Sequence, residues 1–574
     1  MVLPYFTFKI GGQAGQGVKS AGLMFARLAT RSGYWVHNHT EYPSVIRGGH
    51  NVTSVTVSSR PVYAPTKHTD LLVALNKETV SLHNTELIAG SIIVCDTNIK
   101  LDDNLDEQVI CVSVPINKIT REIGEGELLG NTIALGCATA LLNANLEHIN
   151  NLIDSEFADK SPSARIANRK AAKSGFDYVT VNFPQYIKPV LAQRQNVIPL
   201  SVLNADDTVA LGAISAGMQF ASIYPMTPIS NILHTLAPVQ KDFGFIYKQP
   251  EDEISGINMA IGASFAGARS MVATSGGGFC LMTEGYSLAG ITETPLVIVE
   301  GMRGGPSTGM PTWNEQADLR FILHAGQGDF PRIVLAAGDP EEAFHLTLKA
   351  FNLADKYQTP VILILDKNIC EDDQSYGAFE FSRYQVNRGL LTTNKEDDYS
   401  RYKPSGDGIS ARTIPGCGNY FIANSVEHNA VGYSSEEANN RCEQMNKRMK
   451  KLQTYSEEDL PPPILYGPEE AEVTIVSWGS NKGAILEALN CCLKVNFLHL
   501  TRINPFPAKE VSDILKKSKH ILNIECNYTA QMAGLIREQT GIEINDRLLC
   551  YDGRPIYPED IIDKLTNITD AVIK

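Results

Sequence analysis

Residues 6–31, FTFKIGGQAGQGVKSAGLMFARLATR, set the fold class at the start of the chain. Phe6 to Ile10 is an apolar run of strand length, Gly11 to Gly17 is rich in glycine, and Val18 to Arg31 has helical spacing. Further strand-like runs, separated by helix-like runs, follow at Leu71–Leu75, Ser91–Cys95 and Val109–Val114. This alternation predicts an α/β fold with mostly parallel sheets covered by helices.

The same alternation predicts three α/β domains. The first covers residues 1–189. The second covers residues 200–460 and has an irregular extension from residue 367, where polar residues, glycine and tyrosine replace the strand pattern. After a linker of three consecutive prolines, the third domain covers residues 464–574.

Composition excludes several classes of protein. The 574 residues carry a net charge of −14, and no stripe of Lys and Arg is present, so we expect no nucleic-acid partner. No apolar run approaches the roughly 20 residues that span a bilayer. The first twelve residues lack the basic stretch of a secretory signal, and we expect a cytoplasmic protein.

The eleven cysteines are scattered, and no C-x-x-C pair occurs among them. This pattern supports neither a zinc site nor an iron–sulfur cluster on this chain, and we expect reduced structural thiols. No metal ligands are therefore assigned to it.

The glycines Gly12, Gly15 and Gly17 lie between a predicted strand and a predicted helix. Backbone N–H groups and the helix dipole favour an anion at such a turn. The spacing is neither the G-x-G-x-x-G of dinucleotide folds nor a P-loop. Phosphate binding and a tight turn that needs glycine for its backbone angles are both compatible with it.

A second candidate site begins at Tyr224-Pro225-Met226-Thr227-Pro228. Its two prolines make the backbone rigid, so the Thr227 hydroxyl has a fixed direction. The segment follows a short predicted strand and precedes a helix, which is where ligands bind in open α/β sheets. A purely structural turn is the alternative.

Glu253 is the last acid before a predicted helix, Ile254–Gly267, that is rich in small apolar residues and should be buried. A buried carboxyl can keep a proton and share it with a ring nitrogen. Acids in the first turn of a helix also interact favourably with its dipole, so helix capping is the alternative.

Two more loops follow predicted strands. Ser275 and Gly276 open a helix, and Arg303 is the only cation in a loop of small residues after the predicted strand Leu296–Val299. A lone arginine there suits bidentate capture of a carboxylate. Three loops from three strand ends then converge on one candidate site.

These motifs resemble the α subunit of 2-oxoacid:ferredoxin oxidoreductases, and residues 1–189 resemble the γ subunit, so the chain is similar to γ–α fusions. The motifs that carry the resemblance are Gly12–Gly17, Glu41–Gly49, Tyr224–Ser230, Glu253 with Gly262-Ala263, Thr274–Gly278, Arg303–Gly309 with Pro311-Thr312, Asn504–Pro507, Glu525–Asn527 and Tyr551–Pro555. One departure is Thr529-Ala530-Gln531, where the family often has glycine before the glutamine.

The resemblance implies a thiamine diphosphate site whose pyrimidine half lies on this chain. Glu253 would bond N1′ of the aminopyrimidine and promote the imino tautomer that deprotonates thiazolium C2. Arg303 and Thr227 would hold the 2-oxoacid carboxylate. Tyr224, Pro225, Ser275 and Gly276 would contact the cofactor, and Gly12, Gly15 and Gly17 are candidates for contact with coenzyme A or phosphate.

Gly406-Asp407-Gly408 and Asn439-Asn440 imitate the diphosphate–Mg²⁺ motif of thiamine enzymes, but their flanks are polar where that motif needs apolar strands. We therefore interpret them as unrelated to that motif. The resemblance then assigns Mg²⁺, the diphosphate contacts and a [4Fe-4S] cluster to a β subunit, in an (αβ)2 heterotetramer that reduces ferredoxin.

The implied activity is coenzyme A-dependent oxidative decarboxylation of a 2-oxoacid to acyl-CoA and CO2, or the reverse carboxylation. 2-Oxoglutarate is the first candidate substrate. Two other classes stay open from the residues alone: a non-catalytic nucleotide-binding scaffold, and a coenzyme A transferase or acyl-CoA ligase subunit.

Overall fold

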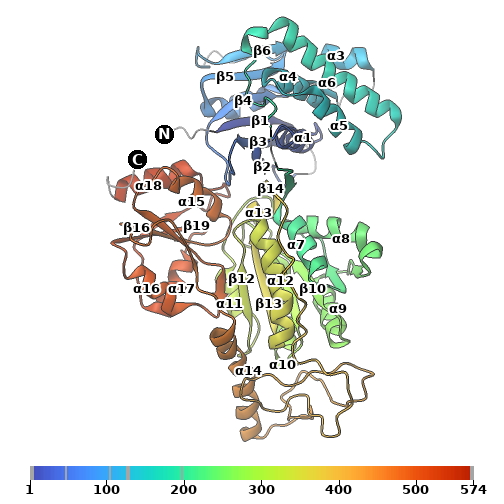
Figure 1. Cartoon of the computed structure of the whole chain (residues 1–574), viewed down its shortest axis with the longest axis vertical. Coiled ribbons are helices and arrows are strands. Elements are labelled where there is room, and N and C mark those ends of the chain that lie inside the picture. Colours follow the sequence, from blue (N-terminus) through green and yellow to red (C-terminus); the bar gives the residue numbers. More distant parts are fainter. Residues whose placement is uncertain (1–4, 46–47, 102–104, 125–128, 196–197, 569–574) are drawn as a thin grey trace. The chain divides into compact units, whose positions relative to one another are not determined.

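A computed structural model describes residues 5–45, 48–101, 105–124, 129–195 and 198–568 (Figure 1). Ile46 and Arg47 of the motif at residues 41–49 lie outside the described residues. The chain forms two compact units. One comprises residues Met1–Leu203, Glu371–Phe379 and Tyr557–Ile561, and the other comprises Asn204–Cys370, Glu380–Ile556 and Ile562–Lys574. No helix in the described ranges is long and apolar enough to cross a membrane.

The first unit is a sheet with helices packed against it. Its elements are β1 (Phe6–Gln13), α1 (Val18–Arg31), β2 (Trp35–Glu41), β3 (His50–Ser58), β4 (Thr69–Ala74), α2 (Lys77–His83), β5 (Leu87–Asp96), β6 (Ile110–Val114), α3 (Ile116–Ile123), α4 (Gly130–Leu141), α5 (Leu146–Glu156), α6 (Pro162–Asn182), β7 (Ser201–Leu203) and β14 (Asp373–Tyr376).

The eight strands of this sheet have the order β6-β5-β4-β1-β3-β2-β14-β7. The pairs from β6 to β1 are parallel, and the pairs from β1 to β7 are antiparallel. No strand was predicted at β2 or β3, because their buried side chains include His37, Asn38, His39 and Thr53. Partners compensate for this burial: His39 Nδ1 lies 2.8 Å from Asp372 Oδ2, next to β14.

Alternate residues of β4 and β5 face opposite sides of the sheet, as the pleat requires. Leu71, Val73 and Val94 belong to the large apolar cluster that includes α1 and α4. Leu72 and Ile93 belong to a smaller cluster that includes part of α2. Helices therefore pack on both faces of this sheet.

The second unit contains two sheets. Its elements are α7 (Ala205–Ser215), β8 (Phe220–Ile223), α8 (Ser230–Phe243), β9 (Ile246–Lys248), α9 (Glu253–Phe265), β10 (Ser270–Thr274), α10 (Gly276–Ile291), β11 (Leu296–Met302), α11 (Leu319–His324), β12 (Ile333–Ala336), α12 (Pro340–Tyr357), β13 (Pro360–Asp366), α13 (Lys367–Glu371), α14 (Ala438–Glu458), β15 (Ile464–Tyr466), β16 (Val473–Ser477), α15 (Asn481–Leu489), β17 (Val495–His499), β18 (Arg502–Asn504), α16 (Ala508–Leu515), β19 (His520–Glu525), α17 (Gln531–Thr540), β20 (Asp546–Leu549) and α18 (Pro558–Ile568), the start of which belongs to the first unit.

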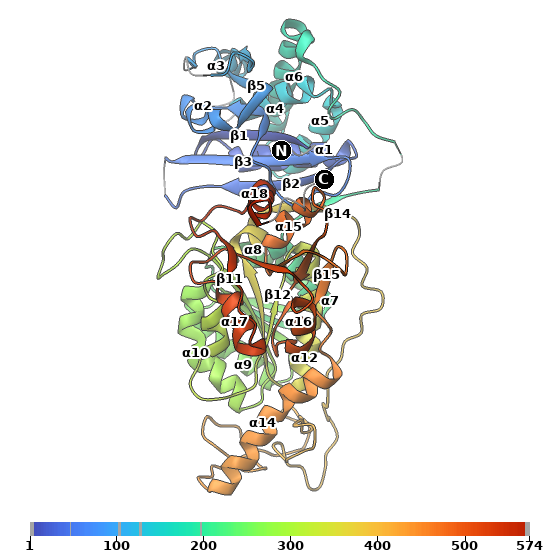
Figure 2. The same ribbon diagram turned by 90° about the vertical axis from the view of Figure 1, so that its left-hand side faces the viewer.

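The larger sheet has the order β18-β12-β13-β11-β10-β8-β9 and the smaller one β15-β17-β16-β19-β20. Each is parallel except for one edge strand, β18 or β15. One apolar cluster joins them and includes Phe279 and Met282 of α10, Ile298 of β11 and Trp478 after β16. Figures 1 and 2 both show α14 extending past the larger sheet, together with irregular loops of the extension.

The expected fold class is confirmed: three sheets, mostly parallel, are covered by helices. The expectation that helix 254–267 is buried was wrong for one face of α9, because Ile254 is 50% and Met259 45% exposed. The small number of charged residues in α9 therefore does not show that every face of this helix is buried. The division into domains 1–189, 200–460 and 464–574 stays a prediction.

Candidate active site

Three neighbouring parallel strands of the larger sheet end beside one another. β10 pairs in parallel with both β8 and β11, so Ile223, Thr274 and Met302 lie at the same edge. The segments that follow these strands are the three loops singled out in the sequence. Parallel strands with helices on their faces leave such an edge open for a ligand.

Arg303 and Thr227 meet directly at this edge. Arg303 Nη1 donates a hydrogen bond of 2.8 Å to the Thr227 carbonyl oxygen. Gly301 permits the approach, because a Cβ there would lie 2.6 Å from the Ile229 side chain. One of the five N–H groups of the guanidinium thus fixes its orientation, and others stay available for a carboxylate.

Glu253 is the first residue of α9 and is only 3% exposed. The capping function belongs to its neighbour: Asp252 Oδ1 accepts a hydrogen bond of 2.7 Å from Ser255 N. Glu253 Oε1 is buried and accepts no hydrogen bond within the described ranges. Gly278 lies against it, since a Cβ at that position would collide with Thr274 Oγ1 and Glu253. A buried acceptor without a donor is costly, which favours a donor from outside the chain.

Ser275 and Gly276 form the start of α10. Ser275 is the N-cap residue and is buried, but its Oγ makes no hydrogen bond with the residues that the structure describes. Gly276 has no room for a side chain, because a Cβ would collide with Asp318 Oδ2. Tyr224 is half-buried and Pro225 is exposed.

Glu300 and Asp318 add an acid pair beside these loops. Glu300 is fully buried, and its carboxyl group forms a side-chain hydrogen bond with the carboxyl group of Asp318. Burial and the neighbouring Asp318 carboxyl raise the pKa of Glu300 well above its ordinary value. Burial, with Glu315 nearby, raises the pKa of Asp318 to about 6. The two carboxyls therefore share at least one proton near neutral pH.

In the first unit, the glycine-rich turn opens onto a cavity. Gly15 and Gly17 have positive φ values of 91° and 70°, which glycine adopts without strain. Both line a cavity of about 450 Å³ whose walls come from α1, α4 and the region of α5 and α6. Gly12 lies in β1, just before the turn. The turn is thus compatible with both interpretations from the sequence. Its backbone angles need glycine, and the cavity beside it leaves room for a phosphate.

The Gly406-Asp407-Gly408 segment is a turn packed on α14. Gly408 has a φ of 82°, Asp407 Oδ1 accepts a hydrogen bond of 2.9 Å from Ile409 N, and no strand flanks the segment. Asn440 Nδ2 donates to the His428 carbonyl oxygen at 3.1 Å. These polar groups stabilise local structure. In the described part of the chain, no group of three or more His, Cys, Asp or Glu residues could hold a metal ion.

Two family descriptions match the sequence. Residues 211–451 match "Pyruvate flavodoxin/ferredoxin oxidoreductase, thiamine diphosphate-binding", and residues 7–178 match "Pyruvate ferredoxin/flavodoxin oxidoreductase". The 2-oxoacid:ferredoxin oxidoreductase subunit alpha of Sulfolobus sp is 31% identical, and the alignment covers 97% of this chain and 96% of the relative. The chain belongs to the family of 2-oxoacid:ferredoxin oxidoreductase alpha subunits.

Two further relatives of this oxidoreductase are 2-oxoglutarate enzymes. The 2-oxoglutarate oxidoreductase subunit KorA of Mycobacterium tuberculosis is 28% identical over 93% of this chain and 87% of its own. A structure of 2-oxoglutarate:ferredoxin oxidoreductase from Magnetococcus marinus, with 2-oxoglutarate, coenzyme A and succinyl-CoA bound, superposes with a TM-score of 0.90 at 29% identity. It covers 99% of this chain and 100% of that one.

The family resemblance seen in the sequence is thereby confirmed, and the scaffold and transferase readings are not favoured. The matched family description makes the oxidoreductase thiamine-dependent, and coenzyme A is bound in the structure of the Magnetococcus marinus relative. The residues of this chain fit the pyrimidine of the cofactor: the buried Glu253 oxygen lacks a donor, and a protonated ring nitrogen is one. As an alpha subunit, the chain belongs to a multi-subunit enzyme.

Sequence reasoning missed Glu300 and Asp318. The predicted strand ended at Val299, whereas β11 continues to Met302, so Glu300 lay outside the predicted strand. An acid directly after a run of buried aliphatic residues was the available signal. Asp318 gave none, because its burial depends on α10, whose first residue is Gly276.

Proposed function

We propose that Glu253, Thr227 and Arg303 form the pyrimidine and substrate half of the active site of this oxidoreductase. The reaction is oxidative decarboxylation of a 2-oxoacid to acyl-CoA and CO2 with reduction of ferredoxin, or its reverse. Two relatives named for 2-oxoglutarate support that acid as the substrate. Thiamine diphosphate, when bound, supplies the nucleophilic carbon and accepts the electrons of the cleaved bond.

The buried, unpartnered Oε1 of Glu253 carries this proposal. In a site this dry, a carboxylate gives and takes a proton at one fixed position, toward a ring nitrogen placed against it. Thr274 and Gly278 lie close to Glu253, because a Cβ at Gly278 would collide with both side chains, and they leave the Glu253 side chain little freedom. Tyr224, Pro225, Ser275 and Gly276 would complete the wall of this half-site.

Glu253→Gln tests this role. The amide has the same shape but cannot accept a proton, so we expect kcat to fall by about 10²–10⁴-fold. Circular dichroism and the melting temperature should match the wild type. Turnover at the wild-type rate in the reconstituted complex would disprove the assignment.

Arg303 is proposed to bind the substrate carboxylate, with Thr227 at the same end of the substrate. Its hydrogen bond to the Thr227 carbonyl aims the guanidinium, and a charge-assisted pair is worth roughly 1.5–3 kcal/mol. Arg303→Ala should therefore raise the Kd for the 2-oxoacid about tenfold or more. The Kd of Arg303→Lys should lie between the values of the wild type and of Arg303→Ala. Unchanged affinity for the 2-oxoacid in both variants would exclude this role.

We infer that a β subunit completes the enzyme and carries Mg²⁺, the diphosphate contacts and the [4Fe-4S] cluster that reduces ferredoxin. An exposed apolar face supports a permanent partner, because such faces mark interaction sites. Ile254 and Leu281 are each 50% exposed, and both line one hollow of about 580 Å³ on α9 and α10. The assembly we propose is an (αβ)2 heterotetramer in the cytoplasm.

Charged substitutions on this face test the partner. Ile254→Asp and Leu281→Asp should each abolish co-purification with the β subunit, because docking would bury the new charge. Leu493→Asp is the matched control, since Leu493 is 47% exposed outside this face. Retention of β by both face variants would place the interface elsewhere.

Gly12, Gly15 and Gly17 are proposed to contact a phosphate of coenzyme A. The cavity of about 450 Å³ beside Gly15 and Gly17 supports this placement. Gly17→Ala should weaken coenzyme A binding, because Asn131 already occupies the space of a Cβ.

Assays of the complex with 2-oxoglutarate, pyruvate and branched-chain oxoacids, with a viologen as electron acceptor, would identify the 2-oxoacid substrate. No preference for 2-oxoglutarate would contradict our assignment.

A further inference from the structure

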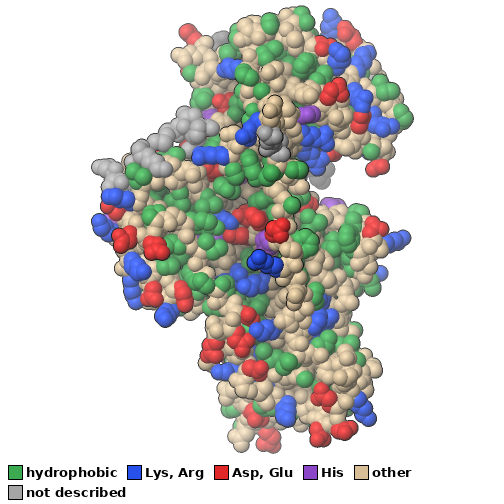
Figure 3. Space-filling model, in the orientation of Figure 1, with side chains coloured by type: hydrophobic (Ala, Val, Ile, Leu, Met, Phe, Trp, Pro, Cys, Tyr) green, Lys and Arg blue, Asp and Glu red, His purple; other side chains and the backbone are tan. Residues whose placement is uncertain are grey.

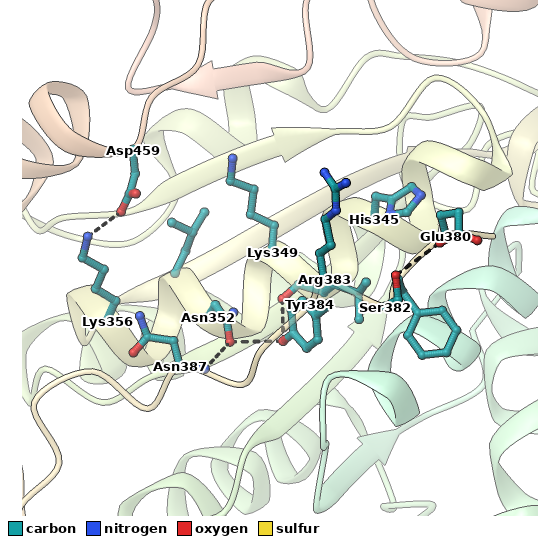
Figure 4. A pocket seen from close by; sticks show the side chains of 13 residues that line it. His345, Lys349, Asn352, Lys356, Glu380, Ser382, Arg383, Tyr384, Asn387 and Asp459 are labelled. Carbon is teal, nitrogen blue, oxygen red and sulfur yellow. Dashed lines mark hydrogen bonds and ion pairs between the residues drawn. The ribbon is translucent and has the colours of Figure 1, made fainter.

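A further cavity of the second unit lies along α12, and none of the candidate active-site residues lines it. It has a volume of about 680 Å³ and is lined by one face of α12, from His345 to Lys356, by residues 380–387 of the extension, and by Asp459 (Figure 4). Its size is that of pockets that hold small molecules. Figure 3 shows basic side chains close to acidic ones where Figure 1 draws α12.

Hydrogen bonds hold the two walls of this cavity together. Asn352 Oδ1 on α12 accepts from Asn387 N at 2.9 Å and from Arg269 Nη2 at 2.9 Å. The Tyr384 hydroxyl lies 3.1 Å from Asn352 Oδ1, and Asn352 Nδ2 donates to the Gln385 carbonyl at 2.8 Å. The cavity is therefore preformed, which lowers the entropic cost of binding a ligand.

Three cations line the cavity, and they differ in their partners. Lys356 Nζ forms ion pairs with Glu458 at 3.0 Å and with Asp459 at 2.8 Å. Lys349 and Arg383 make no hydrogen bond or ion pair within the ranges that the structure describes. In Figure 4 both side chains extend in the same direction from the middle of the cavity, between Lys356 and Glu380.

The position of Lys349 makes the missing partner costly. Burial of its side chain and the nearby Arg502 lower the pKa of Lys349, although Asp459 partly opposes them. A cation that is removed from water and faces a like charge is stabilised by an anion. The matched lysine on the same helix, Lys356, already has its counter-ions.

We propose that this cavity binds a phosphate-bearing metabolite of nucleotide size. The dianionic phosphate would lie between Lys349 and Arg383, since the guanidinium fork suits two phosphate oxygens and the ammonium supplies a second charge. The remainder of the ligand would pack on apolar wall residues. Phe381, which is 50% exposed, provides most of that surface, since Leu348 is only 3% exposed.

The site is independent of the proposed catalytic roles, so its test needs no turnover. ATP is titrated into the purified complex by calorimetry at about 0.15 M salt, where weak surface attraction is screened. Lys349→Gln and Arg383→Gln should each raise the Kd about tenfold or more, the usual range for a charge-assisted pair. Lys356→Gln should change it less than about twofold, because its ion pairs already satisfy that lysine.

Inorganic pyrophosphate and 2-oxoglutarate serve as further probes. Tighter binding of ATP than of pyrophosphate supports a nucleotide, because only ATP can use the apolar wall. Three results overturn the proposal: no binding of ATP, binding that Lys349→Gln and Arg383→Gln leave unchanged, or tighter binding of 2-oxoglutarate than of either phosphate compound. Circular dichroism of each variant shows whether its fold is retained.

Discussion

At the scale of single residues, the Glu300–Asp318 pair is the least ordinary feature of the candidate site. The buried Glu300 carboxyl is hydrogen-bonded to Asp318, and Asp318 also attracts the Arg303 guanidinium. If both carboxyls were ionised, the pair would carry two negative charges next to the arginine proposed to bind an anionic substrate. A proton kept on the pair preserves the positive field of Arg303.

The pair makes stability depend on pH. Glu300 has a pKa near 4.3 when unfolded and a raised pKa when folded, so above about 4.3 the folded state holds the extra proton. The contribution of Glu300 to the free energy of unfolding is thus fully present below about pH 4 and is lost as the pH rises. Glu300→Gln should stabilise the protein by on the order of 1–3 kcal/mol at pH 8 and by less at pH 5. Urea unfolding at both pH values measures this, and equal differences would contradict it.

At the scale of secondary-structure elements, buried ion pairs attach α14 to the rest of its unit. Glu293 is fully buried and pairs with Lys447 at 2.6 Å and Lys451 at 2.5 Å. Arg401 Nη2 donates to the Glu293 carbonyl oxygen at 2.8 Å. Burial lowers the pKa of Lys451 to about 7, against the attraction of Glu293.

Loss of the Glu293 carboxylate should strongly destabilise the folded protein. Glu293→Gln leaves the two lysines of α14 buried without a counter-ion, which costs roughly 3–5 kcal/mol. The melting temperature should fall by several degrees, and the extension should become sensitive to protease. Glu472→Gln is the control, because it removes only surface pairs, with Lys494 and Lys519. A similar small effect of both variants would show that the buried network adds no stability.

The departure from the family pattern at Ala530 has a structural cost. Ala530 precedes α17 with φ 51° and ψ 59°, a left-handed conformation that disfavours a Cβ. Ala530→Gly should therefore stabilise the protein by about 1 kcal/mol, whereas Ala533→Gly inside the same helix should destabilise it. Chemical denaturation compares them. Destabilisation by both would mean that the alanine causes no strain.

The sequence predicted the parallel strands well and the antiparallel ones poorly. The predicted strand Leu296–Val299 begins at the residue where β11 begins, because strands buried on both faces are continuous apolar runs. β2 and β3 carry histidines, asparagines and threonines whose partners are far away in the sequence, such as Asp372 for His39. The same limit applied to the site: residues at strand ends could be found, whereas Asp318 depends on tertiary packing.

At the scale of the whole molecule, the chain passes repeatedly between its two units. Residues 371–379 and 557–561 belong to the first unit, and β14 pairs there with both β2 and β7. A protease site inserted at residues 192–195 should therefore nick the chain without releasing residues 1–191. Gel filtration after cleavage should give a single intact peak. Separation without denaturant would show that the β2–β14 ladder is too weak to hold the fragment.

The same connection sets an order for synthesis. When the ribosome has completed β7, β2 still lacks its neighbour, because β14 begins only at Asp373. At ~5–20 residues per second, the nascent chain waits on the order of 10–30 s for that strand. Throughout this interval β2 presents an unpaired edge, the kind of surface that recruits other polypeptides. We expect chaperones to bind the nascent chain during this interval and to dissociate once Tyr376, the last residue of β14, has emerged from the ribosome.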